Sequence, residues 1–168
     1  FEIYTEKSGS FYYAKPELLE VISTLEGIRQ CSCKYAQIIQ AAESETIGNV
    51  YIYDNFVEAS GAITLSLCFQ AMGYELFRET KSVFYIAADG KRTLKSTYPK
   101  KKRIAILTGI TSANRFSAMI ELMNSYENRH GEYIKVFITS PTGNEGINVN
   151  NVSSIHLVGG DWKYSTIY

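Results

Sequence analysis

Several features that would place this chain in a simple class are missing from its sequence. Its apolar stretches are short and interrupted by charged residues, so no segment is predicted to cross a bilayer as a helix. Lysine plus arginine equals aspartate plus glutamate at 17 each, so no net charge draws the whole protein onto nucleic acid or an anionic membrane. We therefore expect no membrane partner, and any nucleic-acid contact must come from a local patch.

Cysteine is scarce, which favours a reducing compartment. The chain has three cysteines, Cys31, Cys33 and Cys68, and the first two are too close in sequence to bridge comfortably. An odd number of thiols fits the cytosol or nucleus better than secretion. Cys31 and Cys33 lack the second pair that a zinc site needs, so we expect no metal site.

Catalytic motifs are also missing. The sequence has no G-x-x-x-x-G-K-[ST] phosphate loop and no G-x-G-x-x-G turn. No nucleophile with an orienting base can be assembled, and His130 lies far from His156 in sequence. His156 stands in an apolar strand, where a core or sheet-edge histidine is favoured over a catalytic base. We expect no catalytic residue here and no nucleotide hydrolysis by this chain alone.

The length and patterning that are present predict one α/β domain. The 168 residues suffice for a single core, and the chain does not begin with methionine, so we expect a piece of a longer protein. Residues 1–47 are interpreted as a helical lead-in, with one helix opening at Pro16 and closing at Gly27 and another following Ser32. Later segments alternate strands with helices, which predicts parallel β-α-β units. The predicted strands are 50–53, 104–107, 134–139 and 154–158, and the predicted helices are 58–72 and one beginning after Ser112. Residues 74–103 are interpreted as an insertion or long loop that contains one further candidate strand, 83–86.

Three of the predicted strands end in short polar loops. Asp54 and Asn55 follow the first, Thr108 and Gly109 follow the second, and a glycine-rich loop from Ser140 to Asn148 follows the third. The carboxyl ends of parallel strands share one edge, so these loops should converge on one surface. Tight turns alone could explain any one of them. The third loop is the most specific, because its three closely spaced Gly and Asn residues exceed what one turn requires.

Two other features leave alternatives open. The basic run from Lys100 to Arg103 fits either a phosphate contact or a solvated loop. Trp162 fits either a stacking platform or a side chain packed under the sheet.

The ordered loops resemble the second RecA-like domain of superfamily-two helicases. The resemblance is closest to helicase-like ATPases and transcription factors of large cytoplasmic DNA viruses, such as poxviruses and African swine fever virus. It covers about residues 30 to 168. The matching stretches are Gly48 to Gly61, Ile106 to Gly109, Arg115, Asn124 to Asn128, Gly131 to Ser140, Asn144 to Asn148, Asn151-Val152, His156-Leu157 and Asp161-Trp162.

The resemblance implies a RecA-like three-layer domain that forms one wall of an ATP cleft. The first loop resembles helicase motif IV and the third resembles motif V, which lies between two RecA-like domains. Carried over, the nucleic-acid backbone contacts would be Asn55, Thr108, Gly109, Thr139 and Ser140. The nucleotide side would be lined by Gly146, Ile147 and Asn148. ATP and Mg²⁺ would be bound mainly by an N-terminal RecA-like domain of the same protein.

Two departures from the family pattern affect these roles. Many helicases have aspartate where Asn148 stands, so a ribose hydrogen bond would be uncharged here. The family's Gln-x-x-Gly-Arg-x-x-Arg motif, which supplies the arginine finger, would begin beyond Tyr168.

The sequence thus favours the second motor domain of a viral ATP-dependent helicase or translocase that acts on DNA or RNA. The resemblance places such a protein in the host cytoplasm, at viral factories, or in the virion, and viral transcription machinery is an expected partner. One alternative is a non-catalytic helicase-like subunit of a viral transcription complex. Another is a small α/β nucleotide-binding enzyme, against which the missing phosphate loop argues.

Overall fold

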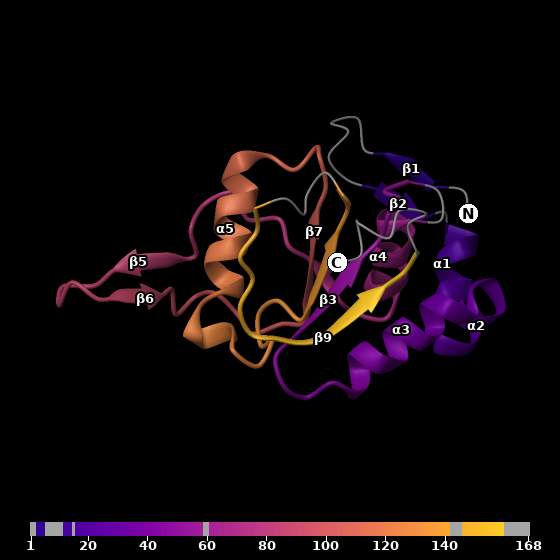
Figure 1. Cartoon of the computed structure of the whole chain (residues 1–168), viewed down its shortest axis with the longest axis horizontal. Coiled ribbons are helices and arrows are strands. Elements are labelled where there is room, and N and C mark those ends of the chain that lie inside the picture. The colour runs from indigo at the N-terminus through magenta and orange to yellow at the C-terminus, as the bar shows by residue number, and fades with distance from the viewer. Residues whose placement is uncertain (1–2, 6–11, 15, 59–60, 142–145, 160–168) are drawn as a thin grey trace.

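A computed structural model of the chain describes residues 3–5, 12–14, 16–58, 61–141 and 146–159. A two-stranded antiparallel sheet near the N-terminus and a group of three helices precede a five-stranded sheet (Figure 1). The elements are β1 (Ile3–Thr5), β2 (Tyr12–Ala14), α1 (Pro16–Ile22), α2 (Leu25–Cys31), α3 (Cys33–Ser44), β3 (Asn49–Tyr53), α4 (Ala62–Ala71), β4 (Glu75–Leu76), β5 (Phe84–Ile86), β6 (Arg92–Leu94), β7 (Arg103–Leu107), α5 (Ala113–Met123), the 3₁₀ helix η1 (Tyr126–Asn128), β8 (Val136–Thr139) and β9 (Val152–Leu157).

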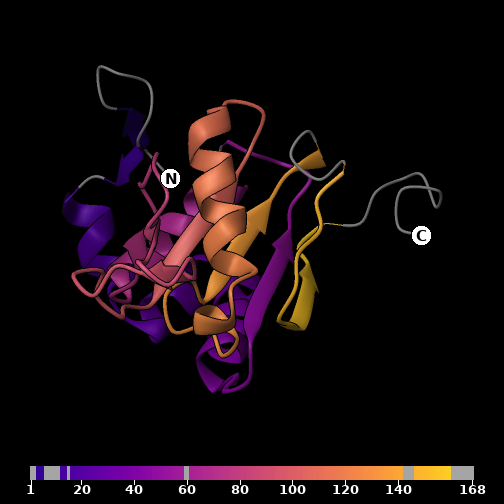
Figure 2. The ribbon, with the colours of Figure 1, turned by 90° about the vertical axis from the view of Figure 1, so that its left-hand side faces the viewer.

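The central sheet has the order β4-β7-β8-β3-β9, and all of its neighbouring strands are parallel. Helix α5 covers one face, while α3 and α4 cover the other (Figure 2). This confirms the α/β class and the three-layer, RecA-like arrangement. No helix among the described residues is both long enough and apolar enough to cross a membrane.

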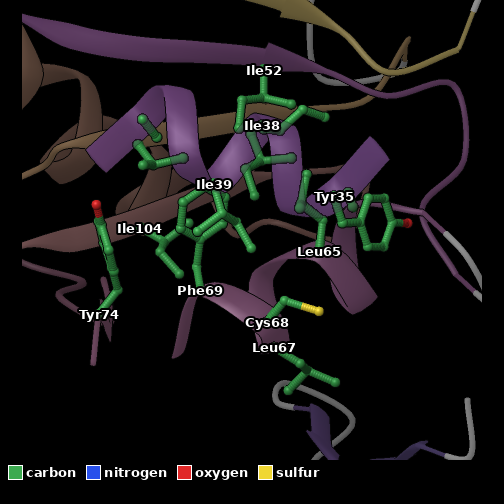
Figure 3. Close-up of a cluster of buried hydrophobic side chains, with 14 of the residues drawn as sticks. Tyr35, Ile38, Ile39, Ile52, Leu65, Leu67, Cys68, Phe69, Tyr74 and Ile104 are labelled. Carbon is green, nitrogen blue, oxygen red and sulfur yellow. The ribbon is translucent and has the colours of Figure 1, made fainter. Parts of the chain in front are cut away.

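Each face of the sheet has its own hydrophobic core, because side chains alternate along a strand. Val50 and Ile52 of β3 pack with the α3 and α4 residues, whereas Tyr51 points to the α5 side. Figure 3 shows the first of these cores, in which Phe69 of α4 and Ile104 of β7 lie among the isoleucines of α3. Packing on both faces fixes the relative positions of the central strands and hence of their carboxyl ends.

The prediction that the first helix ends at Gly27 is wrong. Helix α1 ends at Ile22, and Thr24 begins α2 by accepting a hydrogen bond from the Gly27 N–H at 3.1 Å. A Cβ at Gly27 would lie 1.8 Å from the Val21 carbonyl oxygen. The glycine therefore permits two short helices to meet closely instead of ending one.

The other predicted helices and strands are present with shifted boundaries, whereas strands β1 and β2, inside the predicted helical lead-in, were not predicted. Ser32 caps α3 through the Tyr35 N–H, and Ser112 caps α5. Helix α4 begins at Ala62 rather than Glu58. Within the segment 74–103, the short strand β4 pairs with β7 at the sheet edge, and β5 and β6 form a hairpin.

Candidate nucleic-acid and nucleotide interface at the carboxyl edge

The register of the central sheet brings the three predicted loops side by side. Tyr53 of β3 pairs with Thr139 of β8, which pairs with Leu107 of β7. The next N–H groups continue these ladders, from Asp54 to the Thr139 oxygen at 3.0 Å and from Ser140 to the Leu107 oxygen at 3.2 Å. The loops thus begin at one level on three neighbouring strands, with the β8 loop between the other two.

The β3 loop is organised by Asp54. Its Oδ1 accepts a hydrogen bond from the Phe56 N–H at 3.0 Å, which closes the turn around half-buried Asn55. The side chain is only 1% exposed, and its Oδ2 has no hydrogen-bond partner in the described structure. Burial raises the pKa of the Asp54 carboxyl, and the opposing effects are the Phe56 hydrogen bond and the Lys34 charge. A buried acceptor without a donor is a feature of binding sites as well as a cost to folding.

A recess of about 250 Å³ adjoins this loop, between β3, β9 and the start of α3. Lys34 of α3 donates to the Val158 carbonyl oxygen at 2.8 Å and so ties the helix to the end of β9. The recess can take a small group that donates hydrogen bonds towards the Asp54 carboxylate. Its lining residues are Cys31, Ser32, Lys34, Tyr35, Asp54, Phe56, Val158 and Gly159.

The β7 loop presents backbone at the start of α5. The Thr108 N–H donates to the Thr111 hydroxyl at 3.1 Å, and the Thr111 N–H donates to the Thr108 carbonyl at 3.0 Å. Thr108 is buried by this turn, while Gly109 is exposed and Ile110 is 68% exposed. Unpaired N–H groups at a helix start suit an anion such as phosphate, so this loop can hold a backbone contact.

The start of the β8 loop is not on the surface. Thr139 and Ser140 are both fully buried. The Thr139 hydroxyl lies 3.0 Å from the Tyr51 hydroxyl, on the α5 side of the sheet. The structure therefore brings these two predicted contact residues to the correct edge without exposing their side chains. Residues 142–145, including Gly143 and Asn144, lie outside the described part of the chain.

The far end of this loop is held against α5. Gly146 is exposed with φ at 76°, Ile147 packs against the α5 core, and Asn148 is exposed. Asn124, at the end of α5, donates to the Asn148 carbonyl at 2.8 Å and accepts from the Asn150 N–H at 2.7 Å. The main chain is thus fixed while the Asn148 side chain faces outward, as a nucleotide contact requires.

Sequence reasoning placed Asp54 in the first polar loop without giving it a role of its own, and it gave no role to Lys34 or Asn124. Asp54 and Lys34 line the recess, and Asn124 holds the β8 loop. The contacts of Lys34 and Asn124 join residues 124 and 24 positions apart in sequence, so no local pattern points to them.

Most of the other candidates have structural roles. His156 lies on the edge strand β9, as predicted, where burial lowers its pKa. Arg103 is buried and donates to the Tyr133 carbonyl oxygen, and Lys102 pairs with Glu43 at 2.9 Å. All three thiols are free. Within the described ranges, no cluster of His, Cys, Asp and Glu could hold a metal ion. Trp162 lies outside those ranges.

Comparison with known proteins identifies viral relatives. The chain is 26% identical over 160 residues to "Nucleoside triphosphatase I" of Melanoplus sanguinipes entomopoxvirus, covering 95% of this chain and 20% of that protein. It is 23% identical over 194 aligned residues to "Termination factor NPH-I homolog" of an African swine fever virus isolate from Kenya (Pig/Kenya/KEN-50/1950), covering 94% of this chain and 27% of that protein.

Neither a family model nor a solved structure matches the chain. The chain spans only about a fifth to a quarter of the length of these relatives. The match nonetheless runs through almost the whole chain. The chain is therefore related to nucleoside triphosphatase I and NPH-I termination-factor proteins of entomopoxvirus and African swine fever virus.

Proposed function

We propose that this chain is the second motor domain of an ATP-dependent nucleic-acid translocase or helicase. The observation that carries the proposal is the common row of Tyr53, Thr139 and Leu107, from which three loops project at one edge of a parallel sheet. Ligands bind at such edges because loops and free N–H groups converge there. The names of the relatives, a nucleoside triphosphatase and termination-factor homologues, support a nucleotide-driven activity on nucleic acid.

In this proposal the β3 and β7 loops grip the phosphate backbone. Asn55 and the turn at Thr108 and Gly109 make the contacts, since Gly109 is exposed at the start of α5. Thr139 and Ser140 act by fixing the base of the β8 loop, because both are fully buried. Contacts with phosphate alone suit a motor, which must not depend on base sequence.

The opposite end of the β8 loop supplies one wall of the nucleotide cleft. A Cβ at Gly146 would meet no atom of the described residues within 4 Å, and the Asn148 side chain is exposed, so a ribose or phosphate can approach both. Gly146 and Asn148 can contact one side of a nucleotide, but the sequence has no phosphate loop to hold its phosphates. ATP and Mg²⁺ would be bound mainly by an N-terminal RecA-like domain of the same protein. Residues 1–168 would form the partner domain, with 1–47 as its lead-in and 74–103 as its insertion.

Nucleic-acid-stimulated ATPase activity tests this proposal. The assay needs a longer protein that joins this chain to a phosphate-loop domain, with labelled single strands and duplexes titrated in the presence and absence of an ATP analogue. We expect the analogue to change nucleic-acid affinity, and Asn55→Ala to reduce the stimulation several-fold. Absence of any stimulation in a protein that hydrolyses ATP would contradict the proposal.

A second candidate is a non-motor subunit of a viral transcription complex. The name of the African swine fever virus relatives, and the burial of Thr139 and Ser140, favour it. This candidate predicts that substitutions at Ser140 or Gly146 affect folding only. Comparing ATPase loss with loss of thermal stability in the same variants separates the two candidates.

A further inference from the structure

Charge is divided unequally along this neutral chain. Residues 78–103 contain nine lysines and arginines against two acidic residues, a net charge of +7. The rest of the chain contains eight against fifteen, a net charge of −7. Such a division creates a field along the molecule that orients it towards an anionic partner.

The β5–β6 hairpin carries part of this charge away from the body. In Figure 1 it projects beyond α5, at the opposite end of the long axis from α1 and α2. Strand pairing joins Phe84 to Leu94, Tyr85 to Thr93 and Ile86 to Arg92. One of its faces anchors it, because the Arg92 guanidinium covers the Phe84 ring at 4.0 Å and pairs with Glu121 of α5 at 3.2 Å.

The other face of the hairpin presents an aromatic ring between two lysines. Tyr85 is 49% exposed and stands opposite Thr93. Backbone hydrogen bonds from Ala87 to Lys91 and from Lys95 to Val83 continue the pairing, and the alternation of a strand then puts Lys91 and Lys95 on the same face as Thr93. Lys95 donates to the Ser82 carbonyl at 2.8 Å, a bond that does not neutralise its charge. The Lys91 ammonium has one acidic neighbour, Asp89 at 3.8 Å, and an exposed pair at that distance is weak.

Three of the other basic residues in this segment pair with acidic residues outside it. Lys101 and Arg103 pair with Glu75, and Lys102 pairs with Glu43, so these three join the segment to the body. The outer face of the hairpin is therefore an exposed basic surface on a support that is fixed at both ends.

We propose that this outer face, formed by Tyr85, Lys91 and Lys95, is a second nucleic-acid contact that binds the phosphate backbone while the tyrosine ring stacks on a base or sugar. An aromatic ring among cations is the arrangement that single strands require, because stacking is sequence-tolerant and lysine neutralises phosphate. A single strand offers a phosphate for each lysine and a base for the ring. The proposal goes beyond the loops of the proposed function and requires no motor activity.

A pair of variants with equal charge change tests this contact. Lys91→Gln combined with Lys95→Gln removes two positive charges from the outer face. Arg29→Glu, on α2 at the opposite end of the molecule, lowers the net charge by the same two units. The 168-residue chain and each variant are titrated against labelled single-stranded DNA and RNA of one sequence, by fluorescence anisotropy at several salt concentrations.

We expect the double glutamine variant to bind about tenfold more weakly at low salt, with a plot of log affinity against log salt flatter by about 1.4, since each single-strand phosphate contact contributes about 0.7. Tyr85→Ala should weaken binding by about fivefold or more without changing that slope. Arg29→Glu should retain most of the affinity and the wild-type slope.

Three outcomes would overturn this inference or separate it from the proposed function. If the wild-type chain binds and the hairpin variants bind equally well with unchanged slopes, the hairpin contact is wrong while the loop contacts stand. If Arg29→Glu weakens binding as much as the hairpin variant, only net charge matters and the site is wrong. If the hairpin variant binds nucleic acid as tightly as the wild type but binds a polyglutamate peptide more weakly, the partner is an acidic protein.

Discussion

The polar groups at the amino ends of the central strands (the amino edge) differ in their hydrogen bonding from those at the carboxyl ends (the carboxyl edge). At the amino edge, Asn128 is fully buried and its amide is bonded on both sides. Its Oδ1 accepts from the Tyr133 N–H at 2.8 Å and the Ile134 N–H at 2.9 Å, while its Nδ2 donates to Asn49 and to the Ile134 carbonyl. Lys135 donates to the Gly48 carbonyl oxygen at 2.7 Å, while the buried Asn49 Nδ2 has no hydrogen-bond partner among the described residues.

At the carboxyl edge Thr139 is also buried and bonded, to Tyr51, but several other polar groups are open or lack a donor. Asp54 Oδ2 is buried beside a recess, and Gly109, Gly146 and Asn148 are exposed. Bonded polar groups in a core contribute to stability, whereas open groups at a strand end are available to a ligand. The comparison assigns stability to one edge and binding to the other, and each prediction below tests that assignment.

The largest effect is expected for Asn128→Ala. The substitution leaves two buried N–H groups without acceptors, and we expect a loss of about 2 to 4 kcal/mol in the free energy of unfolding. Urea denaturation followed by circular dichroism measures it. Asn148→Ala, the same change at the carboxyl edge, should stay within about 0.5 kcal/mol of wild type because the side chain is exposed. Similar losses in both variants would remove the distinction between the edges.

Two glycines with matched backbone geometry give the next comparison. Gly131 at the amino edge has φ at 75°, and Gly146 has φ at 76°. Both pay a conformational cost on substitution by alanine, about 1 kcal/mol. A Cβ at Gly131 would also lie 2.8 Å from the Gly48 carbonyl oxygen, whereas one at Gly146 meets no atom of the described residues within 4 Å. We therefore expect Gly131→Ala to be the less stable variant in thermal unfolding, and equal melting temperatures would contradict this.

Asp54→Asn should stabilise the chain at neutral pH. Burial raises the pKa of Asp54, so the folded state holds its proton to higher pH than the unfolded state. The contribution of Asp54 to the free energy of unfolding is therefore greatest below its pKa in the unfolded state. It falls as the pH rises through its pKa in the folded state. We expect a gain of about 1 kcal/mol at pH 7 for the amide, which keeps the turn to Phe56, and no gain below about pH 4. Urea midpoints across that range test it, and a loss of stability at pH 7 would show that the Lys34 charge dominates.

Asn148→Asp should have the smallest effect on folding and a selective effect on nucleotide. A charged acceptor strengthens a ribose hydrogen bond, so we expect about fivefold tighter ATP-analogue binding in the longer protein. Isothermal titration calorimetry measures it. Unchanged affinity would remove Asn148 from the nucleotide wall.

The central strands and the main helices of this fold could be predicted from the sequence. Runs such as Ile104 to Leu107 and the Ser32 and Ser112 caps are local signals, because period and capping depend on neighbouring residues. The break between α1 and α2 was missed, since Gly27 serves a close contact with Val21 rather than a helix end. Strand β4 has only two residues and gains its place by pairing with β7.

The candidate site was predicted in position but not in detail. Parallel strands place their carboxyl ends together, so the convergence of the three loops followed from the strand pattern. The burial of Thr139 depends on Tyr51, 88 positions away, and the recess depends on α3 meeting β9. Such contacts are set by packing between distant segments, which no local pattern encodes.

Mapping a single-stranded oligonucleotide onto the ¹⁵N-labelled chain by NMR tests the assignment of the two edges most directly. We predict that amide shifts move in residues 54–56 and 108–111 and in the β5–β6 hairpin, while residues 128–135 at the amino edge stay unchanged. Shifts concentrated at the amino edge, or none in the carboxyl-edge loops at saturating oligonucleotide, would contradict the account.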